Sequence, residues 1–124
     1  MSSTNDSIAE KAEQLFHGAQ HFNCAQAVAS AFETQFGVSE ALIKDYASKG
    51  GGRAEGGMCG ALYAARQLLG DGIRADALQE QFETLAGDTT CRQVRQAKKL
   101  TCRGCVRTAA ALVEEEILAT SSEE

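Results

Sequence analysis

Residues 101–117 read TCRGCVRTAAALVEEEI and carry the clearest periodic pattern in the chain. Thr101 comes directly before the pattern, and threonine is a favoured residue at the start of a helix. Apolar and small side chains then recur every three or four positions, as on one face of an α-helix: Cys102, Cys105, Val106, Ala109, Leu112, Val113 and Ile117. The segment therefore predicts an amphipathic helix that buries one face in a protein core.

The composition extends this helical prediction to the whole chain of 124 residues. The sequence has no proline, which breaks helices, and 21 alanines, which favour them most strongly. We see no alternating strand pattern and therefore expect an all-α fold, a single-domain bundle of about six or seven short helices. Residues 8–118 are expected to form this domain. Residues 1–7 are expected to be a flexible N-terminus and residues 119–124 a flexible acidic tail.

Apolar stripes and helix-capping residues divide the domain into elements. Before the last helix, we expect helices that start after Asn5 or Asp6, after Asn23, after Ser39, at Cys59, near Arg74 and after Thr90. The second of these is expected to continue to Phe36 and to stop at Gly37. Residues 50–57 read GGGRAEGG, and five glycines in eight residues predict a Gly-rich loop.

Charge and hydropathy exclude some classes of function. Twelve Lys and Arg against seventeen Asp and Glu give a net charge of −5, which argues against a general nucleic-acid-binding protein. No apolar run approaches the roughly 20 residues of a membrane span. The first residues lack the basic and apolar regions of a secretion signal, so we expect a cytoplasmic protein. In a reducing compartment, five cysteines suggest metal binding or redox chemistry more than structural disulfides.

Four of the five cysteines fall at the start of four different predicted helices: Cys24, Cys59, Cys91 and Cys102. Helix N-termini have free N–H groups and a partial positive charge, which lower the pKa of a thiol and stabilise sulfur ligands. Gly57 lies in the loop before Cys59 and would let the backbone approach a cofactor closely. We expect these four cysteines to bind an iron–sulfur cluster and to support electron transfer.

Two alternatives remain open. In a cluster-free thiol–disulfide oxidoreductase or redox sensor, Cys102 would attack as a thiolate, and either Cys105 or Cys91 would resolve the intermediate. A zinc-binding structural or interaction module would use three or four of the same cysteines, and a metal-free core protein would use none. Six basic residues surround Cys91, Cys102 and Cys105 in the sequence, and they would lower the pKa of these thiols or dock an acidic electron-transfer partner. We call them the basic set: Arg92, Arg95, Lys98, Lys99, Arg103 and Arg107.

The sequence resembles the C-GCAxxG-C-C family, whose members are described as redox-active. The resemblance rests on four cysteine segments, FNCAQAV at 22–28, GGMCGAL at 56–62, FETLAGDTTCR at 82–92 and CRGCV at 102–106. The sequence departs from the family at Ala64, where the family has the glycine that closes the central motif around Cys59. Cys102 aligns with the fourth motif cysteine when Val106 is kept in register, which leaves Cys105 as an additional cysteine; otherwise the two exchange roles.

The resemblance implies a redox-active protein. A related module in split-Soret cytochromes is associated with an iron–sulfur centre, although this chain lacks the Cys-x-x-Cys-His motif that attaches haem. It also implies that Gly60, in the Cys-Gly-Ala core, lies with Gly57 beside the cofactor. A redox protein partner is expected, and a cluster shared between two chains would give a homo-oligomer.

Overall fold

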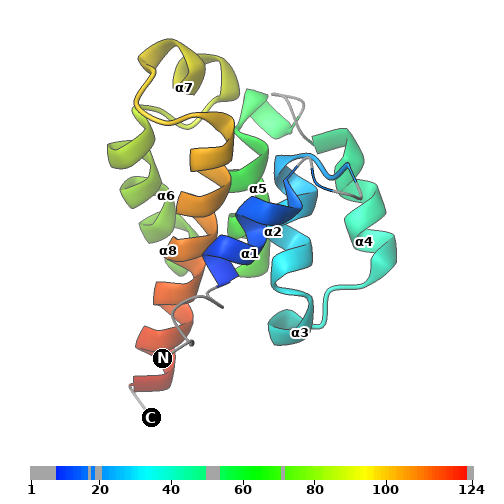
Figure 1. Ribbon diagram of the computed structural model, residues 1–124. Coiled ribbons are helices and arrows are strands. Elements are labelled where there is room, and N and C mark those ends of the chain that lie inside the picture. The colour runs from blue at the N-terminus through cyan, green and yellow to red at the C-terminus, as the bar shows by residue number, and fades with distance from the viewer. Residues whose placement is uncertain (1–7, 17, 19–20, 50–53, 71, 123–124) are drawn as a thin grey trace.

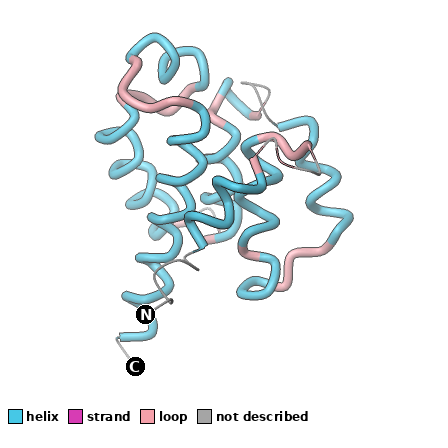
Figure 2. The backbone as a smooth tube through the Cα atoms, in the orientation of Figure 1, coloured by secondary structure: helices cyan, strands magenta, loops and turns pink. Residues whose placement is uncertain are grey.

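The computed structural model describes residues 8–16, 18, 21–49, 54–70 and 72–122. These residues contain no strand, which confirms the all-α fold (Figures 1 and 2). The α-helices are α1 (Ile8–Leu15), α2 (Cys24–Ala31), α3 (Glu33–Phe36), α4 (Glu40–Asp45), α5 (Gly60–Leu68), α6 (Ile73–Ala86), α7 (Cys91–Ala97) and α8 (Cys102–Ser122). Two short 3-10 helices are η2 (Tyr46–Lys49) and η3 (Glu55–Gly57).

Helix α8 lies at the centre of the bundle and contacts α1, α2, α5 and α6 (Figure 1). Its predicted apolar face is the buried face, and Val106, Ala109 and Val113 are completely inaccessible to solvent. The small alanine side chains on α2, α5 and α8 let these helices approach closely, while large side chains such as Phe32 and Phe82 fill the remaining space. The core therefore forms around the segment with the strongest sequence pattern.

The predicted helix over residues 24–36 is divided in the structure. Phe32 departs from helical geometry, with φ −103° and ψ 19°, and separates α2 from α3. Its ring is completely buried and meets the ring of Phe36 edge to face, with the centroids 5.8 Å apart. The chain therefore turns where a large aromatic side chain enters the core. Gly37 ends α3 with φ 64°, the left-handed conformation expected of a terminating glycine.

Three other expected segments differ from the structure or fall outside the described residues. Helix α8 continues to Ser122, so the tail expected from residue 119 begins inside a helix. The expected flexible residues 1–7 and the loop residues 50–53 lie outside the part of the chain that the structure describes. No helix among the described residues is long and apolar enough to cross a membrane.

The end of the Gly-rich loop is tied to the segment that leads into α7. Met58 forms an isolated antiparallel bridge with Thr90, and the Cys59 N–H donates a hydrogen bond to the Thr89 carbonyl at 2.8 Å. Before this segment, Gly87 ends α6 with φ 96°, and a Cβ atom there would lie 2.7 Å from Ala97 Cβ. The tight turn at Gly87 brings α7 back beside the start of α5.

Candidate functional site

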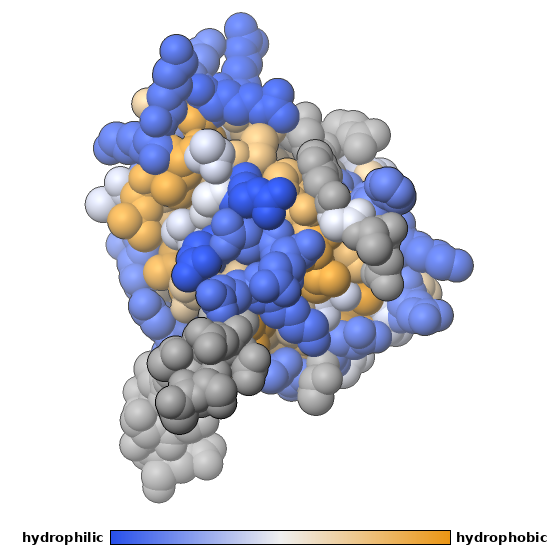
Figure 3. All heavy atoms as spheres, in the orientation of Figure 1, coloured by the Kyte–Doolittle hydropathy of each residue, from blue (hydrophilic) through white to orange (hydrophobic). Residues whose placement is uncertain are grey.

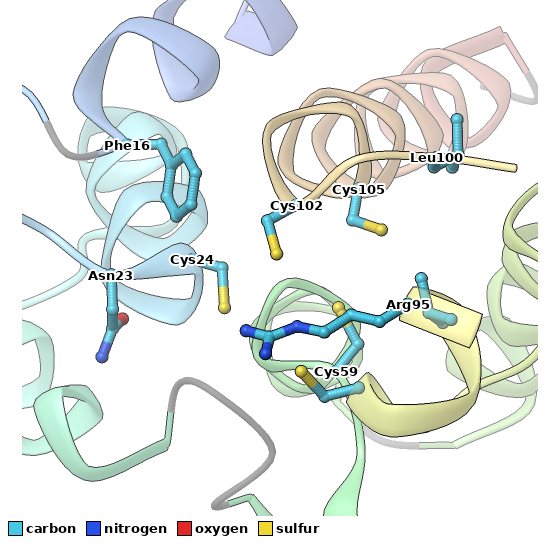
Figure 4. A pocket seen from close by; sticks show the side chains of 10 residues that line it. Phe16, Asn23, Cys24, Cys59, Arg95, Leu100, Cys102 and Cys105 are labelled. Carbon is cyan, nitrogen blue, oxygen red and sulfur yellow. The ribbon is translucent and has the colours of Figure 1, made fainter. Parts of the chain in front are cut away.

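All five cysteines line one cavity of about 250 Å³ (Figure 4). The structure thus brings together the four cysteines predicted as ligands and adds Cys105 to them. We call this space the thiol cavity. The residues that line it are Phe16, Asn23, Cys24, Cys59, Cys91, Val94, Arg95, Leu100, Cys102 and Cys105.

Asn23 fixes Cys24, the first residue of α2. Its side-chain oxygen accepts a hydrogen bond from the Gln26 N–H at 2.8 Å, and the Gln26 side chain accepts one from the Asn23 N–H in return. The Asn23 side-chain amide also donates to the carbonyls of Tyr46 and Ala47, at 3.1 and 3.0 Å. One residue therefore caps α2 and joins it to η2 beside the thiol cavity.

Replacing Asn23 with alanine is expected to lower the free energy of unfolding by about 2 kcal/mol, because both the cap and the link to η2 are lost. Chemical denaturation followed by circular dichroism measures this change. Ser39→Ala is the matched control, since Ser39 only caps α4 through the Leu42 N–H and should cost about 1 kcal/mol. Equal losses in the two variants would show that the link to η2 contributes nothing.

Threonine caps position Cys91 and Cys102 at the starts of their helices. The Thr90 hydroxyl accepts a hydrogen bond from the Gln93 N–H at 3.2 Å, and Cys91 follows as the first residue of α7. The Thr101 hydroxyl accepts one from the Gly104 N–H at 3.0 Å, and Cys102 follows as the first residue of α8. Cys59 is the N-cap of α5 and so stands one position before the helix. The predicted placement at helix N-termini is therefore confirmed.

The five thiols differ in their access to solvent, and none is in a disulfide. Cys59 and Cys105 are buried, with 6% and 2% exposure, and their thiols form a hydrogen bond with each other. Cys24 and Cys91 are partly buried, and Cys102 is exposed. The thiol cavity therefore has a buried pair of thiols and one thiol at the surface.

Burial and neighbouring thiols override the effect of the helix N-termini at two positions. The hydrogen bond to Cys105 raises the pKa of Cys59 well above its usual range, and burial adds to this rise against the N–H groups of Leu62 and Ala61. Burial also raises the pKa of Cys91, although Arg95 opposes the change. The predicted lowering of thiol pKa values is therefore wrong for Cys59 and Cys91.

Arg95 brings a positive charge to this group of thiols. Its side chain runs from α7 across the cavity, with the guanidinium directed toward the Cys24 side (Figure 4). The guanidinium hydrogen-bonds to the sulfur atoms of Cys91 and Cys102. The sequence placed Arg95 in the basic set around the cysteines, but periodicity alone did not distinguish it from its neighbours.

Gly57 and Gly60 are near the site but do not line the thiol cavity. Gly60 is the buried first residue of α5, and Gly57 lines an adjoining hollow with Cys91 and Arg95. Within the described residues, no three side chains of His, Cys, Asp or Glu form a group that could hold a metal ion. Sequence reasoning also missed Phe16 and Leu100 as lining residues and identified Asn23 only as a helix cap, because the side chains that face the cavity are set by tertiary packing.

The surface around the cavity is basic. Residues 91–113 contain six of the twelve Lys and Arg residues and no Asp or Glu. Arg107 pairs with Glu13 at 2.7 Å, and Arg103 donates to the Glu13 carbonyl at 3.1 Å. Arg92, Lys98 and Lys99 are exposed. Figure 3 shows hydrophilic side chains projecting around α7 at the top of the view.

Comparison with known families adds to this geometry. A family model described as "Putative redox-active protein (C_GCAxxG_C_C)" matches residues 22–116. The chain belongs to this family. The C_GCAxxG_C_C match includes all five residues that supply thiols to the cavity, and it confirms the resemblance in the four cysteine segments. No curated protein and no solved structure matches the chain.

Proposed function

We propose that this C_GCAxxG_C_C protein is a small electron-transfer protein that binds an iron–sulfur cluster. Cys24, Cys59, Cys91 and Cys102 would be its ligands. The observation that carries the proposal is the thiol cavity, on which these four side chains converge from the starts of four helices. The residues of the family motif thus meet in space although 78 positions separate the first from the last (102 minus 24).

The donor set suits such a cofactor. Four cysteine thiolates are the usual ligands of [2Fe–2S] and [4Fe–4S] clusters. In a four-iron cluster each cysteine binds a different iron, so the four sulfur atoms need not meet at one ion. Arg95 and the helix N-termini would offset the negative charge of four thiolates. When bound, the cluster would supply one-electron redox chemistry.

The basic surface suits an acidic redox protein as the electron-transfer partner. Residues outside 91–113 carry six basic and seventeen acidic side chains, so positive charge is concentrated beside the thiol cavity. Such a distribution steers an acidic partner toward one face and increases its association rate. A reducing compartment such as the cytoplasm would keep the five thiols available for this role.

Purification without oxygen tests the proposed cofactor. The protein should be brown and contain iron and acid-labile sulfide in matching amounts. Cys91→Ser should reduce both to near background, because one of the four ligands is lost. Cys105→Ser is the matched control and should retain them, since Cys105 is outside the ligand set. Protein that is colourless and iron-free after anaerobic reconstitution would contradict the proposal, and stoichiometric zinc would favour the zinc module.

A further inference from the structure

Cys105 has no role in the proposed cluster but is held against a residue that does. It lies in the second turn of α8, where its N–H donates to the Thr101 carbonyl at 2.8 Å. Its thiol hydrogen-bonds to that of Cys59, the N-cap of α5. Both residues line the thiol cavity and both are buried, so packing of α5 against α8 holds them together (Figure 4).

Cys102 connects this buried pair to solvent. Cys102 and Cys105 are three residues apart on α8, so their side chains lie on the same face of the helix. Both line the thiol cavity, but Cys102 is exposed whereas Cys105 is 2% exposed. The exposed Cys102 is therefore followed on the same helix by the buried Cys105, which in turn contacts the buried Cys59.

We propose that Cys59 and Cys105 form a disulfide in the metal-free protein, and that oxidation reaches them through Cys102. The oxidant is a small-molecule disulfide such as glutathione disulfide. Cys102 attacks it, forming a mixed disulfide and releasing one glutathione thiol. Cys105 then attacks the sulfur of Cys102 and releases the second glutathione. Cys59 finally attacks the sulfur of Cys105, which forms the Cys59–Cys105 bond and returns Cys102 to a thiol.

The electrons and protons balance in this series. Two protein thiols lose two electrons and two protons, and one glutathione disulfide becomes two glutathione thiols. Because Cys59 is also a proposed cluster ligand, the disulfide and the cluster would exclude each other. This regulatory consequence rests on the proposed function, whereas the disulfide itself does not depend on any metal.

Disulfide mapping tests the inference on metal-free protein. The full chain is treated with chelator and reductant, incubated with glutathione disulfide, quenched in acid, alkylated and digested with trypsin. Cleavage after Arg103 separates Cys102 from Cys105, so each pairing gives a distinct mass. The main product should join the peptide containing Cys59 to the peptide 104–107. A final product that leaves Cys105 reduced would overturn the inference.

Serine variants test the route of oxidation through Cys102 separately from the formation of the Cys59–Cys105 disulfide. Cys102→Ser should give the same disulfide about tenfold more slowly, because the accessible thiol is lost. Cys91→Ser is the matched control and should form it at the normal rate. An unchanged rate in Cys102→Ser would overturn the proposed route.

The iron assay keeps this inference distinct from the proposed function. Cys105→Ser should lose the disulfide and keep the iron. If wild-type protein binds no iron but still forms the Cys59–Cys105 disulfide, only the proposed cluster fails. If wild-type protein binds iron, but Cys105 stays reduced when the metal-free protein is treated with glutathione disulfide, only the disulfide fails.

Discussion

Cys59→Ser is expected to abolish both iron binding and the internal disulfide, because Cys59 belongs to the proposed ligand set and to the buried thiol pair. Any other single Cys→Ser change should abolish at most one of the two. A serine oxygen cannot form a disulfide and is a poor substitute for a thiolate in a cluster. Iron and sulfide assays on anaerobic protein measure the first loss, and disulfide mapping on metal-free protein measures the second.

The fold of this variant has to be checked, because Cys59 is buried. Circular dichroism should show wild-type helix content, and Cys59→Ala provides a second variant without a buried hydroxyl. Cys105→Ser controls for the disulfide alone. Wild-type iron content in a folded Cys59→Ser protein would remove Cys59 from the ligand set.

Phe82→Ala is expected to have the largest effect on stability, lowering the free energy of unfolding by about 3–5 kcal/mol. The Phe82 ring on α6 is completely buried in the core, and α6 contacts both α5 and α8. Removing the ring leaves a cavity that rigid helices cannot close fully. Because a small domain is stable by only about 5–15 kcal/mol, the loss would be a large fraction of the total. Urea denaturation measures it.

Leu85→Ala is the control on the same helix, because Leu85 is 49% exposed and should change the free energy by less than about 1 kcal/mol. Both substitutions replace an apolar side chain of α6 with alanine, and helix propensities differ by only a few tenths of a kcal/mol, so most of the difference reports burial. A loss below about 1 kcal/mol for Phe82→Ala would show that α6 packs less tightly than described.

The sequence predicted the features that depend on neighbouring residues. The caps Asn23 and Thr90, the terminator Gly37, and the long helix after Thr101 are all found in the structure. Each depends on a hydrogen bond or a backbone preference within a few positions of the chain. Because Cys24, Cys91 and Cys102 each follow a capping residue, their places at helix starts were predictable as well. Cys59 instead follows the Gly-rich loop and is itself the N-cap.

Features that depend on distant contacts were not predictable in the same way. The break at Phe32 depends on a ring that enters the core, and the Cys59–Cys105 contact depends on how α5 packs against α8. Arg95 belongs to a run of similar basic residues, and only the tertiary structure shows that its guanidinium reaches two thiols. The α8 extension beyond residue 118 crosses the Ala-Thr-Ser segment, where the apolar pattern stops.

The distribution of the cysteines along the chain also sets the order in which the protein can mature. Thiols at positions 24, 59 and 91 emerge from the ribosome before α8, yet α8 supplies Cys102 and the surface on which four other helices assemble. A nascent chain without α8 would have neither the complete set of proposed ligands nor the core that brings these cysteines together. Delivery of the proposed cluster would then follow synthesis of α8, and early intermediates would need a reducing environment to keep their thiols from pairing wrongly.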